Sequence, residues 1–430
     1  MTSSPWRASR PLATVSIRCI ASDATQSSVA AVTSGGEVFS SAGIRPHVIS
    51  VGLDGVLRTE GTFGTSQAEV EDTVLGVIPS VTRGWSGQRR RILLYAHGGL
   101  VNEEGAIQRI ADYRGPLLDV EVYPLAFVWR TDYWTTLTNI LRDANARRRP
   151  EGAFDRMKDF LLDRADDFLE PVARLLSGKA EWDEMKKNAE MATVNPDGGA
   201  RFAASCLARL KQSEPSTEFH AVAHSAGSIL IARMLQLLCT RGAIADGPMM
   251  GQEGLGVRVA SCTLWAPACT MALFRETYLP LVQSGQIGRL ALFALTDKAE
   301  REDDCANLYH KSLLYLVSDA FEERERIPPF VEGEPLLGMQ KFIEAEPAIG
   351  ALVRAGKCDV VYSPNLEPAG DPNASASQSH GAFDDDQATV RATLARVRGA
   401  KMAGQTITFH RSASGLRDRR RLLVPEDSGR

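Results

Sequence analysis

Ser225 lies where a serine hydroxyl would be exposed between a strand and a helix. Residues 218–222 are typical of a buried strand, and residues 229–235 have the apolar content of a packed helix. Ala223 and Gly227, two residues to either side, are small enough for a sharp turn. Such turns also occur as ordinary helix N-caps. We predict that Ser225 is a nucleophile, because its context exposes the hydroxyl beside the positive end of a helix.

A second candidate element follows the strand-like residues 91–96 and reads His97-Gly98-Gly99. Acyl transfer develops a negative charge on oxygen, which two backbone amides can stabilise. The amide of Ala226 could supply one donor, and a glycine loop after a neighbouring parallel strand could supply the other. A tight strand-to-helix turn is the alternative interpretation. Together with Ser225, we predict an oxyanion hole formed by Gly98, Gly99 and Ala226.

These two motifs resemble those of the α/β-hydrolase fold, in particular of its lipase and esterase branch. That branch carries His-Gly-Gly and Gly-His-Ser-Ala-Gly motifs, and this chain has Ala223-His224-Ser225-Ala226-Gly227. Ala223 replaces the first glycine of the second motif, and Leu100 stands where many esterases carry a third glycine. The resemblance extends over roughly residues 90–400 in the order of elements, and is sharp only at the motifs.

The resemblance implies a base after the last strand and an acid before it, in the chain order Ser, acid, His. His380 follows the last strand-like run, and His310 is the rival base. Asp297 is the first residue after residues 290–296, and Asp304 is the second choice. We interpret most of the acidic cluster, which includes Glu300, Glu302 and Asp303, as a solvated loop and helix cap. The predicted triad is therefore Ser225, His380 and Asp297.

The predicted function is hydrolysis of a small-molecule or lipid-like carboxylic ester through an acyl-enzyme. The same residues could cleave amide, carbamate or peptide bonds, and a catalytically silent binding scaffold is a third reading. The mechanism requires no metal or organic cofactor. Residues 384–386 are three consecutive aspartates, which we assign to a helix start rather than to a metal site.

Composition restricts the class of partner. The 430 residues carry a net charge of −4, so no nucleic-acid partner is expected. The seven cysteines are scattered and lack metal-ligand spacing, which favours reduced thiols and a cytoplasmic protein. No stretch is apolar enough to predict stable membrane insertion, and the sequence does not predict the oligomeric state.

The alternation of strand and helix patterns predicts an α/β fold, with a mostly parallel central sheet and helices on both faces. Residues 13–17 and 46–51 are expected to form antiparallel edge strands, and residues 67–82 a helix. Further strands are predicted up to His97 and at residues 120–129, 257–264, 290–296 and 358–362.

About 90 residues separate Trp129 from the strand before Ser225, far more than a simple crossover needs. Apolar residues recur at helical spacing from Phe154 to Leu175, which indicates an amphipathic helix. We predict that residues 131–195 form a helical cap or lid; an ordinary helix packed on the sheet is the alternative. The hydrolase core would then comprise residues 1–130 and 196–400, and residues 401–430 would form a C-terminal extension.

Overall fold

The computed structural model describes most of the chain between residues 31 and 399. The described residues are 31–34, 37–99, 101–129, 139–140, 143, 169–303, 305, 309–324, 326 and 330–399. The predicted strand at residues 13–17 and the extension at 401–430 lie outside them.

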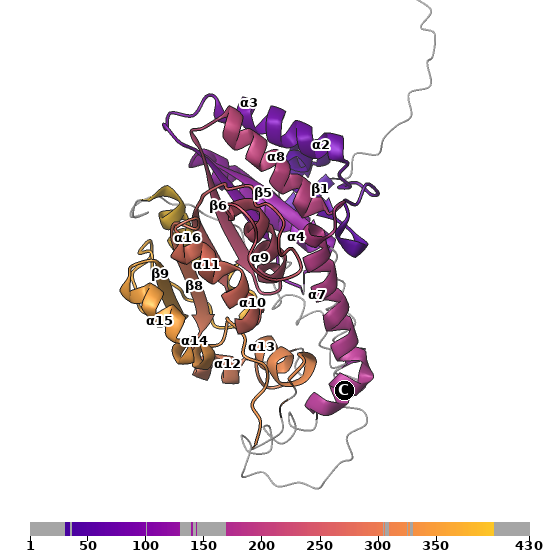
Figure 1. The fold of residues 1–430 in the computed structure, drawn as a ribbon, viewed down its shortest axis with the longest axis vertical. Helices are drawn as coiled ribbons and strands as arrows, with labels where there is room; N and C mark the ends of the chain where they lie inside the picture. Colours follow the sequence, from indigo (N-terminus) through magenta and orange to yellow (C-terminus); the bar gives the residue numbers. More distant parts are fainter. Residues whose placement is uncertain are drawn as a thin grey trace, which may run out of the picture.

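The core is a seven-stranded sheet in which all neighbouring strands are parallel, in the order β3-β5-β4-β6-β7-β8-β9 (Figure 1). A separate two-stranded antiparallel sheet pairs β1 with β2. The strands are β1 Ala31–Ser34, β2 Glu37–Ser40, β3 Val48–Val51, β4 Arg90–Ala96, β5 Val122–Trp129, β6 Thr217–His224, β7 Val259–Trp265, β8 Leu290–Leu295 and β9 Cys358–Ser363.

Helices lie in front of and behind the sheet in Figure 1. The α-helices are α1 Ser41–Ile44, α2 Gln67–Asp72, α3 Ile78–Thr82, α4 Glu103–Asp119, α7 Lys179–Val194, α8 Gly199–Ser213, α9 Gly227–Cys239, α10 Met271–Glu276, α11 Tyr278–Gln283, α12 Asp297–Glu302, α13 Leu313–Leu316, α14 Gln340–Ala345, α15 Pro347–Arg354 and α16 Gln387–Arg398. Short 3₁₀ or π turns are η1 Arg45–His47, η2 Leu53–Gly55, η3 Thr73–Val77, η4 Arg174–Gly178, η5 Val317–Phe321 and η6 His380–Ala382. The chain is thus an α/β protein with one parallel sheet flanked by helices.

The strands are parallel because almost every one is followed by a helix that returns the chain to the same edge. Strand β5 is buried along its whole length, and β4 and β6 are buried over most of theirs. Such continuous apolar burial is typical of strands covered on both faces. The predicted strands at 120–129, 257–264, 290–296 and 358–362 are confirmed to within three residues at each end. Residues 67–82 are helical throughout, as predicted.

The predicted antiparallel pairing of residues 46–51 was wrong. Val48–Val51 form β3, which pairs parallel with β5, and all four residues are buried. The short alternating run suggested an exposed antiparallel edge, but α8 packs against β3 and covers it. Antiparallel pairing occurs instead in β1 and β2, where residues 35 and 36 separate the two strands.

Most of the amphipathic helix predicted from Phe154 to Leu175 lies outside the described residues. The described end of the predicted cap continues through η4 into α7. Helix α7 packs along α9 and η2, and it buries Trp182, Met185 and Ala189. This part of the segment is therefore joined to the helices that pack on the sheet.

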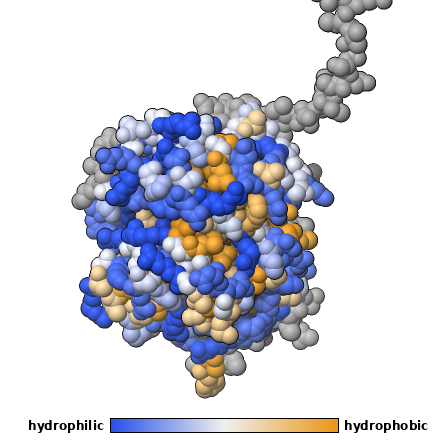
Figure 2. All heavy atoms as spheres, turned by 45° about the horizontal axis from the view of Figure 1, so that its top comes forward, coloured by the Kyte–Doolittle hydropathy of each residue, from blue (hydrophilic) through white to orange (hydrophobic). Residues whose placement is uncertain are grey.

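The surface seen in Figure 2 is mostly hydrophilic, with apolar residues in several separate groups. The apolar core extends through both helical layers and includes the largest buried aromatic side chains, such as Trp182, Tyr278 and Phe293. Six cysteines of the described residues are buried free thiols, at positions 206, 239, 262, 269, 305 and 358. Among the described helices, none has the length and hydropathy needed to cross a membrane.

Helix α9 begins very close to the end of strand β4. A Cβ added to Gly227 would lie 2.4 Å from the carbonyl oxygen of Ala96 and 2.7 Å from that of His97. Both atoms belong to the backbone, so they cannot move aside as a flexible side chain would. Glycine at this position therefore sets how closely the β6–α9 turn approaches the His97 loop.

We expect Gly227→Ala to destabilise the protein by about 1–3 kcal/mol, because the methyl group would force the two backbones apart. Gly350→Ala in α15 is the matched control. Its Cβ would meet only the end of the Arg354 side chain at 3.4 Å, and alanine in a helix gains about 0.5–1 kcal/mol over glycine. Thermal unfolding of both variants tests this, and equal or higher stability of Gly227→Ala would contradict it.

Candidate active site

Ser225 occupies a strained turn between β6 and α9. Its φ angle is 50°, in the left-handed region that non-glycine residues rarely adopt. The turn is held from both sides: the Ser225 amide donates to the carbonyl of Trp265 at 2.9 Å, and the Ser225 carbonyl accepts from the amides of Ser228 and Ala268. The Ser228 hydroxyl adds a third bond to that carbonyl at 2.6 Å. These contacts keep the serine in a conformation that the isolated chain would avoid.

His380 meets Ser225 although 155 residues separate them. Nε2 of His380 lies 2.8 Å from Oγ of Ser225, and both residues are only 3% exposed. His380 opens η6, which follows β9 and a long loop. This is the geometry in which an imidazole can accept the proton of a serine hydroxyl. The structure thus brings together the predicted nucleophile and base, while His310 lies before α13 with a partly exposed side chain.

His224 holds the main chain of His380 in place. Its Nε2 lies 2.9 Å from the His380 carbonyl oxygen, so Nε2 carries the proton and donates it. The two rings lie 5.6 Å apart between centroids. Sequence reasoning assigned no role to His224, because a histidine beside the nucleophile was expected to point away or pack. The sequence feature that could have indicated this role is the position of His224 directly before Ser225.

Among the described residues, Asp303 supplies a carboxylate that contacts the backbone of His380. Its Oδ2 accepts a hydrogen bond from the His380 amide at 2.9 Å, and the residue is buried. Asp303 follows α12, at the carboxyl end of β8. It belongs to the acidic cluster that the sequence suggested was solvated, so its burial could be learned only from the fold.

Asp297, the predicted acid, is engaged elsewhere. Its Oδ1 accepts a hydrogen bond from the Tyr315 hydroxyl, and its Oδ2 lies 2.8 Å from Nε of Arg301. These two donors hold the pKa of Asp297 below its ordinary value, against a larger opposite effect of burial. Asp297 thus lies in the first turn of α12 and is bound there by neighbouring side chains. The alternative acid, Asp304, lies outside the described residues.

The glycine loop after β4 lies against the turn that carries Ser225. A Cβ on Gly98 would be 3.3 Å from Cβ of Ser225, and one on Gly99 would be 3.2 Å from Cβ of Ala226. On its other side Gly99 faces Met185 of α7, whose sulfur would lie 2.6 Å from the added carbon. Among the described residues, none accepts a hydrogen bond from the amides of Gly98, Gly99 or Ala226. The backbone amides of Gly98, Gly99 and Ala226 therefore lie near the serine without an acceptor from the described part of the chain.

His97 connects this loop to the end of β5. Its Nδ1 donates to the Gly98 carbonyl at 2.9 Å, and its Nε2 accepts from the Trp129 amide at 3.3 Å. The Trp129 indole donates in turn to the His97 carbonyl at 3.1 Å. Burial lowers the pKa of His97 to about 4, so the ring is neutral near pH 7 and keeps this tautomer. His97 therefore shapes the loop and carries no charge toward the serine.

A buried ion cluster anchors the segment that follows His380. Arg109 of α4 pairs with Asp384 at 3.4 Å and with Asp385, and the Tyr113 hydroxyl donates to the Asp384 carbonyl. The predicted helix start at residues 384–386 therefore applies only to Asp386, which caps α16. The other two aspartates fasten the chain after His380 to α4.

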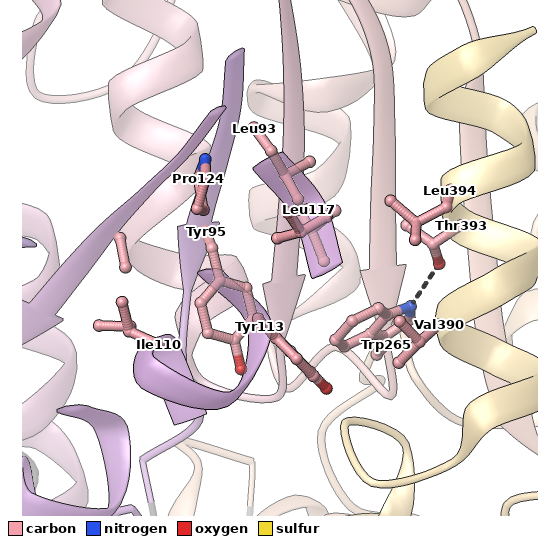
Figure 3. A pocket seen from close by; sticks show the side chains of 12 residues that line it. Leu93, Tyr95, Ile110, Tyr113, Leu117, Pro124, Trp265, Val390, Thr393 and Leu394 are labelled. Atoms are coloured by element: carbon pink, nitrogen blue, oxygen red, sulfur yellow. Dashed lines mark hydrogen bonds between the residues drawn. The ribbon is translucent and has the colours of Figure 1, made fainter. Parts of the chain in front are cut away.

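An apolar cavity lies between the sheet and helices α4 and α16 (Figure 3). Its lining includes Tyr95, Tyr113 and Trp265, and the Trp265 indole donates to the Thr393 hydroxyl at 3.1 Å. Its volume of about 30 Å³ is far below the several hundred cubic ångströms of pockets that hold small-molecule ligands. The cavity is thus a packing gap beneath the site and does not have the size of a substrate pocket.

Neither a metal-binding group in the described residues nor a similar known protein was found for this site. Within the residues that the structure describes, no group of three or more histidine, cysteine, aspartate or glutamate side chains is placed to hold a metal ion. Comparison with protein-family models, with curated proteins and with solved structures gave no match.

Glu300, in the same acidic segment, provides a test of the packing around Asp303. It is 1% exposed, accepts a hydrogen bond from the Ser312 hydroxyl, and has a pKa raised by burial from 4.5 to about 8. The folded protein thus holds this proton at pH values where the unfolded chain has lost it. Its contribution to stability is favourable below about pH 4.5 and declines as the pH rises to 8.

We expect Glu300→Gln to gain stability relative to the parent as the pH rises from 5 to 8, because glutamine resembles the protonated acid and does not ionise. The measurement is the unfolding temperature of both proteins at several pH values in this interval. Glu302→Gln is the control, because Glu302 lies on the same helix with 66% of its side chain exposed. A difference between Glu300→Gln and the parent that stays constant with pH would contradict the raised pKa.

Proposed function

We propose that this chain is a serine hydrolase with an α/β-hydrolase fold that cleaves carboxylic esters. The observation that carries the proposal is the 2.8 Å contact between Nε2 of His380 and Oγ of a serine with a φ of 50°. A strained serine on a strand-to-helix turn, in contact with an imidazole, is the arrangement of an activated nucleophile. The parallel sheet and the chain order of Ser225, Asp303 and His380 also agree with this fold.

The first half of the reaction forms an acyl-enzyme. Ser225 Oγ attacks the ester carbonyl carbon while its proton passes to Nε2 of His380. The carbonyl oxygen becomes an oxyanion, for which the amides of Gly98, Gly99 and Ala226, which have no acceptor among the described residues, would be the donors. The intermediate collapses when the carbon–oxygen bond to the alcohol breaks, and His380 returns the proton to the leaving alcohol.

The second half regenerates the serine. A water molecule gives its proton to Nε2 of His380 and attacks the acyl carbon, and the bond to Ser225 Oγ then breaks as His380 reprotonates that oxygen. The carboxylic acid is released. No metal or organic cofactor takes part in this scheme.

We assign Asp303, in place of Asp297, as the acid that orients His380. Asp303 is buried and contacts the His380 backbone at 2.9 Å, whereas both oxygens of Asp297 are bound by Tyr315 and Arg301. Through its bond to the His380 amide, Asp303 would hold the main chain that carries the imidazole in place during each proton transfer. His224 is a positioning residue, since it acts on His380 through the backbone.

Covalent labelling tests the nucleophile. A fluorophosphonate should modify Ser225 in the parent, and Ser225→Ala should lose both the label and hydrolysis of 4-nitrophenyl esters, with turnover falling by about four orders of magnitude or more. Ser284→Ala is the control, because Ser284 is exposed at the end of α11 and its hydroxyl donates to the Leu281 carbonyl, away from Ser225. Label on another residue, or near-normal turnover of Ser225→Ala, would contradict the proposal.

The same assay separates the chemical alternatives. Turnover of 4-nitroanilides or carbamates at rates above those of matched esters would favour amide or carbamate cleavage by the same residues. A folded parent that neither reacts with the fluorophosphonate nor turns over any of these substrates would favour a silent binding scaffold.

A pair of isosteric substitutions tests the acid. Asp303→Asn should lower kcat by about two orders of magnitude or more and move the acidic limb of the pH profile to lower pH, because the imidazolium loses its negative neighbour. Asp297→Asn should leave that limb in place. Thermal unfolding of both variants controls for lost packing. A shifted limb in Asp297→Asn alone would return the role to Asp297.

A further inference from the structure

A large open cleft lies at the opposite edge of the sheet from Ser225. It is formed at the amino ends of β4, β6, β7, β8 and β9 and by the last turn of α16, and its volume is about 780 Å³. Ser225 follows the carboxyl end of β6, whereas Glu218 and His220 lie at the start of that strand. At about 3.3 Å per residue, a strand of this length separates the two places by roughly 20 Å.

The lining of this cleft is basic in a chain that is acidic overall. Six arginines contribute to it, against three carboxylates, so the lining carries three positive charges in excess. We call it the basic cleft. The arginines are Arg89, Arg91, Arg258, Arg289, Arg396 and Arg398. Concentrated charge of one sign in a concave surface attracts ligands of the opposite sign.

Ion pairs within the cleft neutralise only some of its arginines. Asp359 binds both Arg289 and Arg396, at 2.6 and 3.1 Å, and Glu218 binds Arg89 at 3.1 Å. Arg396 and Arg398 also lie in the last turn of α16, where positive charge offsets the helix dipole. The charges of these arginines are therefore compensated within the protein, by carboxylates and by the helix dipole.

Arg91 and Arg258 are different. In the part of the chain that the structure describes, no carboxylate lies within ion-pair distance of either guanidinium. Within the described chain, the one hydrogen bond of the Arg258 side chain goes to the Gly285 carbonyl at 3.3 Å. Glu121 is close enough to Arg91 for their charges to interact, but its carboxylate takes its hydrogen bonds from Ser86 and the amide of Gly87. Two cationic groups of the basic cleft thus remain available to a ligand.

The floor of the cleft holds unused hydrogen-bonding atoms. His220 is 2% exposed and its Nδ1 lies 2.8 Å from the Ser261 hydroxyl. The Ser261 hydroxyl can donate to Nδ1, which leaves the proton on Nε2. Among the described residues, neither Nε2 of His220 nor Nε of Arg91 has a hydrogen-bond partner, although both atoms are buried. Buried polar atoms without a partner are uncommon and call for an acceptor.

Burial and the three arginines nearest to His220 lower its pKa to about 3, so the ring is neutral near pH 7. A neutral imidazole with its proton on Nε2 still donates a hydrogen bond. Arg91, Arg258 and His220 therefore offer donors, and a ligand that satisfies them must supply several acceptor oxygens.

We propose that the basic cleft binds a small molecule that carries a phosphate group, with Arg91, Arg258 and His220 as its ligands. Phosphate oxygens accept the multiple charge-assisted hydrogen bonds that guanidinium groups provide. The volume exceeds what a single phosphate fills and falls in the range of pockets for small organic ligands. The site is separate from Ser225, so it does not depend on the proposed hydrolase activity.

The test uses the full chain and pyrophosphate as the probe, with binding measured by calorimetry at constant ionic strength. We expect saturable binding at one site, weakened about tenfold or more in Arg91→Gln and in Arg258→Gln. Lys298→Gln removes the same charge at the far edge of the sheet, where Lys298 is 81% exposed, and should bind as the parent does. Ser225→Ala should also bind normally, which separates this site from the hydrolase site.

Two results would overturn the proposal. One is the lack of saturable pyrophosphate binding, or binding that neither arginine substitution weakens while all variants remain folded. The other is binding to vesicles of an anionic phospholipid without binding of soluble pyrophosphate, which would assign the basic cleft to a lipid surface. Inorganic phosphate, used as a second probe, should compete with pyrophosphate at higher concentration if the phosphate group itself is recognised.

Discussion

The turn between β6 and α9 is the constraint on which the rest of the site depends. Ser225 has a positive φ, and Gly227 brings the helix within contact of the β4 backbone. The strain is tolerated because Trp265, Ala268 and Ser228 all bind the Ser225 main chain. The serine hydroxyl is thereby held at the carboxyl edge of a parallel sheet, where the loops of neighbouring strands converge.

The loops around that turn are held by polar contacts to their main chains. His224 binds the carbonyl of His380, Asp303 binds its amide, and Arg109 holds the chain four and five residues further on. On the opposite side, His97 binds the end of β5 and so orients the glycine loop. All these groups are buried, so each bond is stronger than it would be in water and each loss leaves an unpaired polar atom.

The two edges of the sheet present opposite chemistry. The carboxyl edge buries Ser225 and His380 in mutual contact among backbone donors. The amino edge opens into the basic cleft, where Arg91 and Arg258 lack carboxylate partners within the described chain. Because every strand runs in the same direction, residues at strand starts and residues after strand ends are kept apart by the length of a strand. One sheet can therefore carry two independent sites.

The sequence alone determined the α/β class, the order of most strands along the chain, and the elements that contain Ser225, Gly98 and His380. These features depend on local periodicity and on small residues at a turn. It did not determine the direction of β3 or which acidic residue meets His380. Asp297 and Asp303 are six residues apart and equally acidic, and only packing decides that one is bound by Arg301 and Tyr315 while the other is buried beside His380. The basic cleft was likewise invisible in the sequence, because its arginines come from four separate segments that only the parallel sheet and α16 bring together.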